Sequence, residues 1–179
     1  MKKNPVKYIT LFIVALIVRL LPFRAPNLEP IMAIQMPFAK VYGGLYAFMF
    51  GFMSIAVYDA LTSGIGIWTW IAAFAYGFVG LGARIYLKNR SSWKNYAIYA
   101  LIGTIFFDAL TGLTLGPIFF GQTFAVALLG QIPFTIIHLL SNISFAIVLS
   151  PMIAKWIEKS ESVSVSIPKK RFAFNSFKI

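Results

Sequence analysis

Long apolar stretches separated by short polar segments make up most of the chain. A short stretch at about 30–40 begins at a proline, which is favoured at the first helical position. Five longer stretches have the length of helices, and we expect these helices at about 7–23, 42–61, 67–87, 95–111 and 133–159. Since a backbone in lipid must satisfy its own polar groups, apolar stretches of this length indicate membrane-spanning α-helices.

The segment between the fifth and the last of these helices needs a separate explanation. Residues 117–157 are apolar over about twice a minimal span, and Pro133 divides them. We therefore expect a partial or re-entrant helix at about 119–129. The predicted fold is an all-α integral membrane protein: a six-transmembrane-helix bundle over residues 1–159, with an additional short or re-entrant helix before the last span. Residues 160–179 lack an apolar period and are expected to form a basic, disordered cytoplasmic tail.

The composition supports the membrane assignment. Hydrophobic residues make up 59% of the chain, charged residues 12%, and the mean hydropathy is +0.80. A soluble domain of this size could not bury so much apolar surface. The chain has no cysteine, which excludes disulfides and thiolate metal sites.

The placement of charge predicts the topology. Most basic residues lie in three segments, 2–7, 84–94 and 155–178. By the positive-inside rule all three segments are cytoplasmic, which places both termini on the cytoplasmic side of the cell membrane. The first helix is followed by no small-residue cleavage site, so we expect it to be retained. The net charge of +11 then sets topology and contacts anionic lipid headgroups, and nucleic acid is not expected as a partner.

A repeated sequence carries two of the five acidic residues. Tyr58-Asp59-Ala60-Leu61-Thr62 returns as Phe107-Asp108-Ala109-Leu110-Thr111, and a Gly-rich segment follows each copy. A carboxylate at the edge of an apolar stretch is costly and is usually retained for function. Two such loops at the same depth in the membrane suggest that the two halves of the chain form one site between them. The alternative is that each carboxylate accepts hydrogen bonds from its own turn, with help from the threonine.

Further polar and aromatic residues complete the predicted substrate site. Each has a structural alternative: an ion pair with Arg19 or Arg24 for Glu29, an aromatic belt for the ring residues, and a hydrogen bond to a neighbouring helix for the histidine. One histidine and scattered carboxylates do not make a metal site. With both aspartates, the predicted substrate-binding residues are Asn27, Glu29, Asp59, Trp68, Asp108, Phe120, Gln122, His138 and Asn142.

Small residues recur at helical spacing on two of the predicted helices. Gly43, Ala47 and Gly51 follow one face of the third helix, and the fourth carries Ala73, Gly77 and Gly80. Such faces allow close backbone contact in lipid, either within the chain or with a partner. Packing within the chain is the favoured alternative, and the stripe on the fourth helix is the candidate partner interface. The chain has no nucleophile elbow, metalloprotease motif or phosphate-binding loop, so we expect neither enzymatic activity nor a cofactor.

Three segments carry a resemblance to a known family. They are residues 43–48 (GGLYAF) after the short second helix, 68–82 (WTWIAAFAYGFVGLG) and 142–151 (NISFAIVLSP). Together with the size and the six predicted helices, these segments resemble the substrate-binding S components of energy-coupling factor (ECF) transporters, which take up vitamins and related micronutrients. The resemblance covers roughly residues 8–157. Ala15 is followed four residues later by Arg19, which departs from the Ala-x-x-x-Ala face of many members. The chain also lacks the N-terminal histidine of the nickel and cobalt members.

The resemblance implies a substrate site and partner proteins. Family members hold their substrate near the outer face, under the loops after helices 1, 3 and 5, where the chain has Glu29, Asp59 and Asp108. The implied partners are a transmembrane coupling (T) protein and two ATPase subunits on other chains. Two alternatives stay open at this point. One is a secondary transporter that uses Asp59 and Asp108 as a proton or cation relay, and the other is a non-transport scaffold subunit of a membrane complex.

Overall fold

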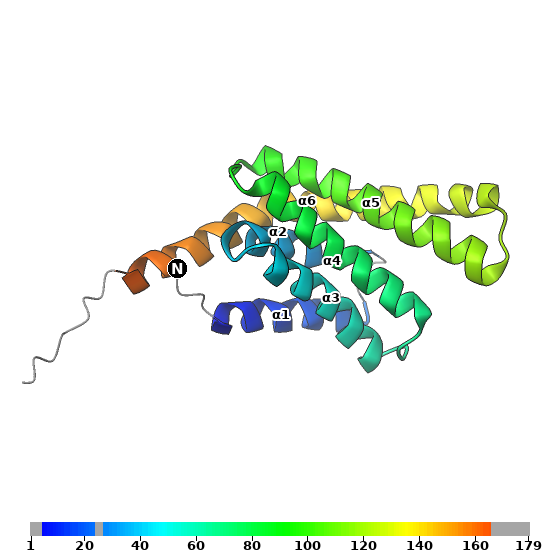
Figure 1. The fold of residues 1–179 in the computed structure, drawn as a ribbon, viewed down its shortest axis with the longest axis horizontal. Coiled ribbons are helices and arrows are strands. Elements are labelled where there is room, and N and C mark those ends of the chain that lie inside the picture. Colours follow the sequence, from blue (N-terminus) through cyan, green and yellow to red (C-terminus); the bar gives the residue numbers. More distant parts are fainter. Residues whose placement is uncertain (1–4, 24–26, 166–179) are drawn as a thin grey trace, which may run out of the picture.

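The fold is all-helical over the part of the chain that is described. A computed structural model describes residues 5–23 and 27–165, with side chains as far as residue 159. The helices are α1 (Pro5–Leu20), α2 (Ile31–Val41), α3 (Gly44–Leu61), α4 (Ile67–Leu87), α5 (Trp93–Phe120) and α6 (Phe124–Val165). Figure 1 shows an elongated bundle in which α5 and α6 extend together beyond the other helices. The predicted tail lies outside the described residues from 166 onward, and α6 continues as far as Val165.

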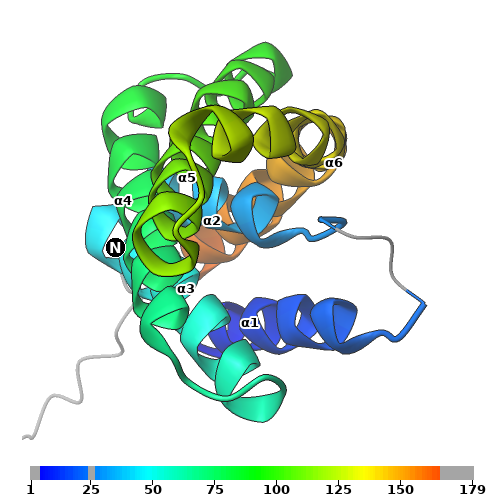
Figure 2. The ribbon, with the colours of Figure 1, turned by 90° about the vertical axis from the view of Figure 1, so that its right-hand side faces the viewer.

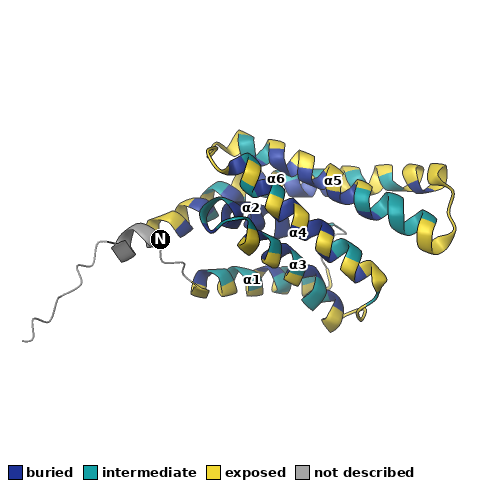
Figure 3. Cartoon of the chain, in the orientation of Figure 1, coloured by how far each residue is buried: buried dark blue, intermediate teal, exposed yellow. Residues whose placement is uncertain are grey.

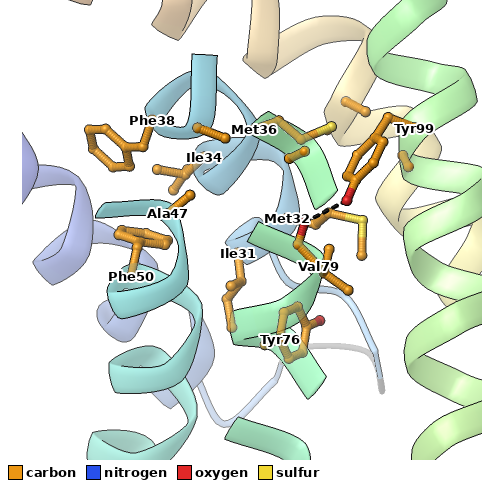
Figure 4. Close-up of a cluster of buried hydrophobic side chains, with 14 of the residues drawn as sticks. Ile31, Met32, Ile34, Met36, Phe38, Ala47, Phe50, Tyr76, Val79 and Tyr99 are labelled. Atoms are coloured by element: carbon orange, nitrogen blue, oxygen red, sulfur yellow. Dashed lines mark hydrogen bonds between the residues drawn. The ribbon is translucent and has the colours of Figure 1, made fainter. Parts of the chain in front are cut away.

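The short helix α2 forms the centre of the bundle. All its residues from Ile31 to Ala39 are buried, and α3, α4 and α6 surround it (Figures 1 and 2). Figure 4 shows its apolar side chains packed against residues of α3, α4 and α5, among them Phe50, Tyr76 and Tyr99. At 1.5 Å per residue, 11 residues rise only about 16 Å, roughly half of a hydrocarbon core. This helix is therefore an internal element and not a span.

Helices α3 and α4 are held together around one glutamine of α2. The Gln35 side-chain nitrogen donates to the backbone oxygens of Ala47, at 2.9 Å, and Tyr76, at 2.7 Å. A Cβ atom added to Gly51 would lie 2.3 Å from this nitrogen, and one added to Gly80 would lie 2.6 Å from it. The glycines therefore leave room for an amide that satisfies one carbonyl on each neighbouring helix.

This packing corrects the predicted partner surface. Ala73, Gly77 and Gly80 are all buried inside the chain. A Cβ on Gly77 would meet the Phe48 ring at 2.5 Å, and one on Gly80 would meet the Ala47 backbone at 2.6 Å. The small residues face α3, since close approach of these two helices requires them there, and they present no surface to another protein.

The predicted break after the second Asp-Ala-Leu-Thr segment is also wrong. Helix α5 continues through Thr111 and Gly112 to Phe120, and α6 is continuous through Pro133, so no separate re-entrant helix exists. A Cβ on Gly112 would lie 1.7 Å from the Gln131 side chain. The glycine that we interpreted as part of a loop is thus the point where α6 approaches α5. Packing between two long helices offsets the roughly 3 kcal/mol that an interior proline costs.

Four helices, α3 to α6, are long and apolar enough to cross a membrane. Their outward faces carry large exposed hydrophobic side chains, such as Phe74 and Phe78 on α4 and Ile102 and Ile105 on α5. Figure 3 shows exposed positions along both of these helices. A water-soluble protein rarely exposes contiguous apolar surface of this kind. The chain is therefore a helical, membrane-embedded protein. The predicted count of six spans is not confirmed, because α1 has 16 residues and α2 only 11.

The basic segments meet at one end of the bundle. The Lys40 ammonium group lies 2.8 Å from Ser91 Oγ and 3.1 Å from the Glu158 carboxylate, and Arg84 donates to the Lys40 backbone oxygen at 2.7 Å. Lys7 donates to the backbone oxygen of Trp156. These contacts join the starts of α1 and α5 to the ends of α2, α4 and α6. The opposite end of α3, where Asp59 lies, belongs to the candidate site.

Candidate functional site

A cavity of about 310 Å³ lies at the end of the bundle opposite the basic segments. Residues from every helix or its flanking loop line it. Its polar and charged lining comprises Arg19, Asn27, Glu29, Asp59, Tyr76, Thr111 and His138. Its apolar lining comprises Ile55, Trp68, Ala72, Phe107, Leu115 and Phe134. Polar and apolar residues thus contribute about equally to the lining, and convergent polar groups between apolar walls are typical of a small-molecule site.

Glu29 is fixed on two sides. Arg19 Nε lies 2.9 Å from Glu29 Oε2, which confirms the ion pair that we considered for this loop. The Tyr76 hydroxyl donates to Glu29 Oε1 at 2.8 Å. Arg19 itself donates to the Ser54 backbone oxygen at 3.2 Å and covers the Tyr58 ring at 3.9 Å. A carboxylate held in this way is oriented before any ligand arrives, although it is only 7% exposed.

Tyr76 connects this ion pair to the only histidine of the chain. Its hydroxyl oxygen lies 3.4 Å from His138 Nε2, and its ring packs on Phe107 with centroids 4.3 Å apart. His138 Nδ1 lies 2.7 Å from Asp108 Oδ1. A continuous series of polar contacts therefore runs from α1 through α4 and α6 to α5: Arg19, Glu29, Tyr76, His138 and Asp108.

Asp59 lies in the cavity, but its partner differs from the one expected. Its Oδ2 atom accepts a hydrogen bond from Thr69 Oγ1 at 2.7 Å, and that hydroxyl accepts from the Gly66 backbone N–H at 3.1 Å. Asp59 therefore joins the end of α3 to the first turn of α4. The Thr62 hydroxyl donates instead to the Tyr58 backbone oxygen at 2.8 Å, so the turn threonine does not satisfy the carboxylate.

Asp108 does not share this cavity, which corrects the prediction of two carboxylates in one site. It is 1% exposed and sits inside α5, with His138 between it and the cavity. It lines instead an apolar cleft of about 280 Å³ between α5 and α6, where no described residue hydrogen-bonds to its Oδ2 atom. Because α5 does not break after Thr111, the side chain of Asp108 is held on the helix face that meets α6. The two copies of the Asp-Ala-Leu-Thr motif thus adopt different local structures.

The other predicted residues divide between the cavity and other places. Asn27, which has a φ of 60°, and Trp68 both line the cavity. Asn142 is fully buried and donates to Thr104 Oγ1 at 2.9 Å, which is a contact between α6 and α5. Phe120 and Gln122 lie where α5 gives way to α6, outside the cavity lining. A site that includes these last two residues is not supported by the geometry.

Several residues of the site were not predicted from the sequence: Tyr76, Phe107 and Phe134 are among those that line the cavity, and Thr69 holds Asp59. Tyr76 had a detectable signal, because it is a polar residue inside the small-residue stripe of α4. Thr69 follows a glycine at the start of a helix, where a hydroxyl commonly serves the first turn. The two phenylalanines cannot be distinguished in the sequence from the many that face lipid.

The chemistry available in the cavity is recognition. Two carboxylates accept hydrogen bonds, one guanidinium neutralises part of their charge, and aromatic rings offer flat apolar walls. Within the described ranges no three histidine, aspartate or glutamate side chains are grouped closely enough to hold a metal ion. Comparison with known proteins finds no matching family model, no matching characterised protein and no matching solved structure.

Proposed function

We propose that the chain is the substrate-binding S component of an ECF-type uptake transporter for a vitamin or related micronutrient. The observation that carries the proposal is the cavity at the end of the bundle opposite the basic segments, with a preoriented carboxylate and aromatic walls. Its volume of about 310 Å³ suits a compact molecule with a single ring system. The sequence resemblance places the substrate of such proteins at the corresponding end.

The orientation follows from charge. Lys7, Lys40, Arg84 and the start of α5 lie at one end, and the positive-inside rule places that end in the cytoplasm. The cavity then opens toward the outer face, where an uptake system must collect its substrate. A transmembrane T protein and two ATPase subunits on other chains would supply the energy. The surface that meets them is not the small-residue stripe of α4, which is buried.

The test is to identify what co-purifies with the protein, both small molecules and partner proteins. Mass spectrometry of the purified protein should find one retained small molecule, and pull-down from the native membrane should recover the T protein and the ATPases. Arg19→Met should reduce the retained molecule while leaving the recovered partners unchanged. Phe78→Ala, on the lipid-facing side of α4, serves as the control and should change neither.

Two other results would replace the proposal. Uptake that follows a proton gradient in vesicles without any ATPase would favour a secondary transporter. Stable membership of a membrane complex without any retained or transported molecule would favour a scaffold subunit.

A further inference from the structure

The hydrogen positions in the buried polar series can be derived from its chemistry. Glu29 is paired with Arg19, and an ionised carboxylate can only accept hydrogen bonds. The single hydroxyl hydrogen of Tyr76 therefore points to Glu29, to which the distance is 2.8 Å. As a hydrogen bond, the contact of 3.4 Å between the Tyr76 oxygen and His138 Nε2 then needs its hydrogen from the histidine, which assigns a proton to Nε2.

This assignment determines the state of the next contact. His138 Nδ1 and Asp108 Oδ1 are 2.7 Å apart, a distance that requires a hydrogen between them. Since Nε2 already carries one proton, the pair holds a second one, either as imidazolium with carboxylate or as neutral imidazole with carboxylic acid. In both forms the pair is neutral overall. An ionised aspartate beside a neutral histidine would instead leave a net negative charge next to an apolar cleft, where Asp108 Oδ2 receives no hydrogen bond from the described residues.

We propose that the His138–Asp108 pair is a proton-binding site coupled to the cavity: it holds two protons while Tyr76 donates to Glu29, and it releases one of them when a ligand cation takes over Glu29. In the released state Tyr76 turns its hydrogen to a bare Nε2, and Nδ1–H donates to the Asp108 carboxylate. One proton leaves Nε2 through the cavity, no covalent bond between heavy atoms changes, and the positive charge of the ligand replaces the charge that departs. The release step rests on the proposed function, whereas the resting proton does not.

The surrounding charges are consistent with this exchange. The titratable or charged groups that face the pair and the cavity come from each neighbouring element: Arg19 of α1, Glu29 before α2, Asp59 of α3 and Tyr76 of α4. Two carboxylates and one guanidinium leave one net negative charge in the cavity beside the neutral pair. A monocation would neutralise that charge. The net negative charge that the His138–Asp108 pair carries after it releases its proton would be tolerated only while the ligand is bound.

The chain offers a direct readout, because His138 is the only histidine. Protein labelled with ¹⁵N-histidine, purified with a histidine-free tag and reconstituted in lipid nanodiscs, gives signals from this residue alone. Retained small molecules are first washed out, which mass spectrometry confirms. A one-bond N–H coupling then shows which ring nitrogen carries a proton as the pH is raised. We expect Nε2 to be protonated in the ligand-free protein at neutral pH.

Two variants test the coupling to Tyr76. In Tyr76→Phe the ratio of protonated to bare Nε2 at neutral pH should fall by about tenfold, because Nε2–H loses its acceptor. Glu29→Leu should cause a similar fall, since the phenol hydrogen is then free to turn to Nε2. Tyr86→Phe, which removes a hydroxyl from the basic end of the bundle, should leave the ratio unchanged.

Two results would overturn the proposal. A bare Nε2 in the wild-type protein at neutral pH would show that Tyr76 donates to His138 and that the pair holds no additional proton. An equal ratio of protonated to bare Nε2 in the wild-type protein and in Tyr76→Phe would show that the pair is not coupled to the cavity. If Glu29→Leu does not fold, Tyr76→Phe decides alone. Both measurements of Nε2 protonation are made without substrate. Their outcome is therefore independent of whether the protein retains a micronutrient or recovers a T protein, which tests the proposed function.

Discussion

The hydroxyl of Tyr76 donates a hydrogen bond of 2.8 Å to the carboxylate of Glu29 across the centre of the bundle. Tyr76 lies in the middle of α4, and Glu29 precedes the first turn of α2. Both residues are buried, so this contact fixes the N-terminal end of α2 relative to α4. The same contact orients a carboxylate of the cavity and joins it to His138.

Removing that hydroxyl should affect stability and binding together. Tyr76→Phe leaves one buried carboxylate oxygen without its donor, and a hydrogen bond to a charged group contributes about 1.5–3 kcal/mol. We expect a lower melting temperature in detergent and a smaller amount of retained small molecule. Tyr86→Phe is the control. Unchanged melting and retention in Tyr76→Phe would mean that the contact is not formed in the folded protein.

The two aspartates of the repeat should behave differently. In Asp59→Asn the amide oxygen can still accept from Thr69, while the cavity loses a charge. We expect ligand affinity to fall by roughly ten- to a hundredfold, measured by titration with the compound found by mass spectrometry, with little change in the ligand-free melt. Asp108→Asn removes the charge from the fully buried contact with His138, which weakens a charge-assisted hydrogen bond, and should lower the ligand-free melting temperature. Identical profiles for the two variants would contradict their different positions.

The glycines around Gln35 should tolerate no side chain. In Gly80→Ala the added Cβ would lie 2.6 Å from both the Gln35 nitrogen and the Ala47 backbone, and such overpacking typically costs about 1–3 kcal/mol. We expect a lower yield of folded protein and a lower melting temperature. Gly130→Ala is a matched control in α6, because nothing lies within 4 Å of the added atom. A fully stable Gly80→Ala would show that α3 and α4 are further apart than described.

The proposed orientation can be checked by labelling. Ser63 follows α3 at the cavity end, and Ser91 contacts Lys40 at the basic end. The natural chain has no cysteine, so Ser63→Cys and Ser91→Cys each introduce a single thiol. An impermeant thiol reagent added to intact cells should label Ser63→Cys only, and Ser91→Cys should react after the membrane is opened. Labelling of both from outside would refute the topology.

The sequence by itself determined the class of protein and most of its helices. Apolar stretches at 42–61 and 67–87 match α3 and α4 closely, because in lipid every backbone group must be satisfied within its own helix. The ion pair between Arg19 and Glu29 was also accessible, since two opposite charges near one apolar boundary have few other partners. Five of the residues predicted to bind substrate line one cavity, and their role in binding stays a prediction: Asn27, Glu29, Asp59, Trp68 and His138.

The tertiary structure decided what the glycines, the prolines and the second aspartate do. A Gly-rich segment predicts a turn, and Gly64 does adopt a φ of 81° in one, but Gly112 lies in a helix because α6 approaches there. The roles of Gln35 and Tyr76 were equally hidden, since their partners are backbone and side-chain groups 12 to 62 residues away in the chain. Local sequence specifies which backbone conformations are favourable. Which neighbour fills the space beside a small residue is determined only when the helices pack together.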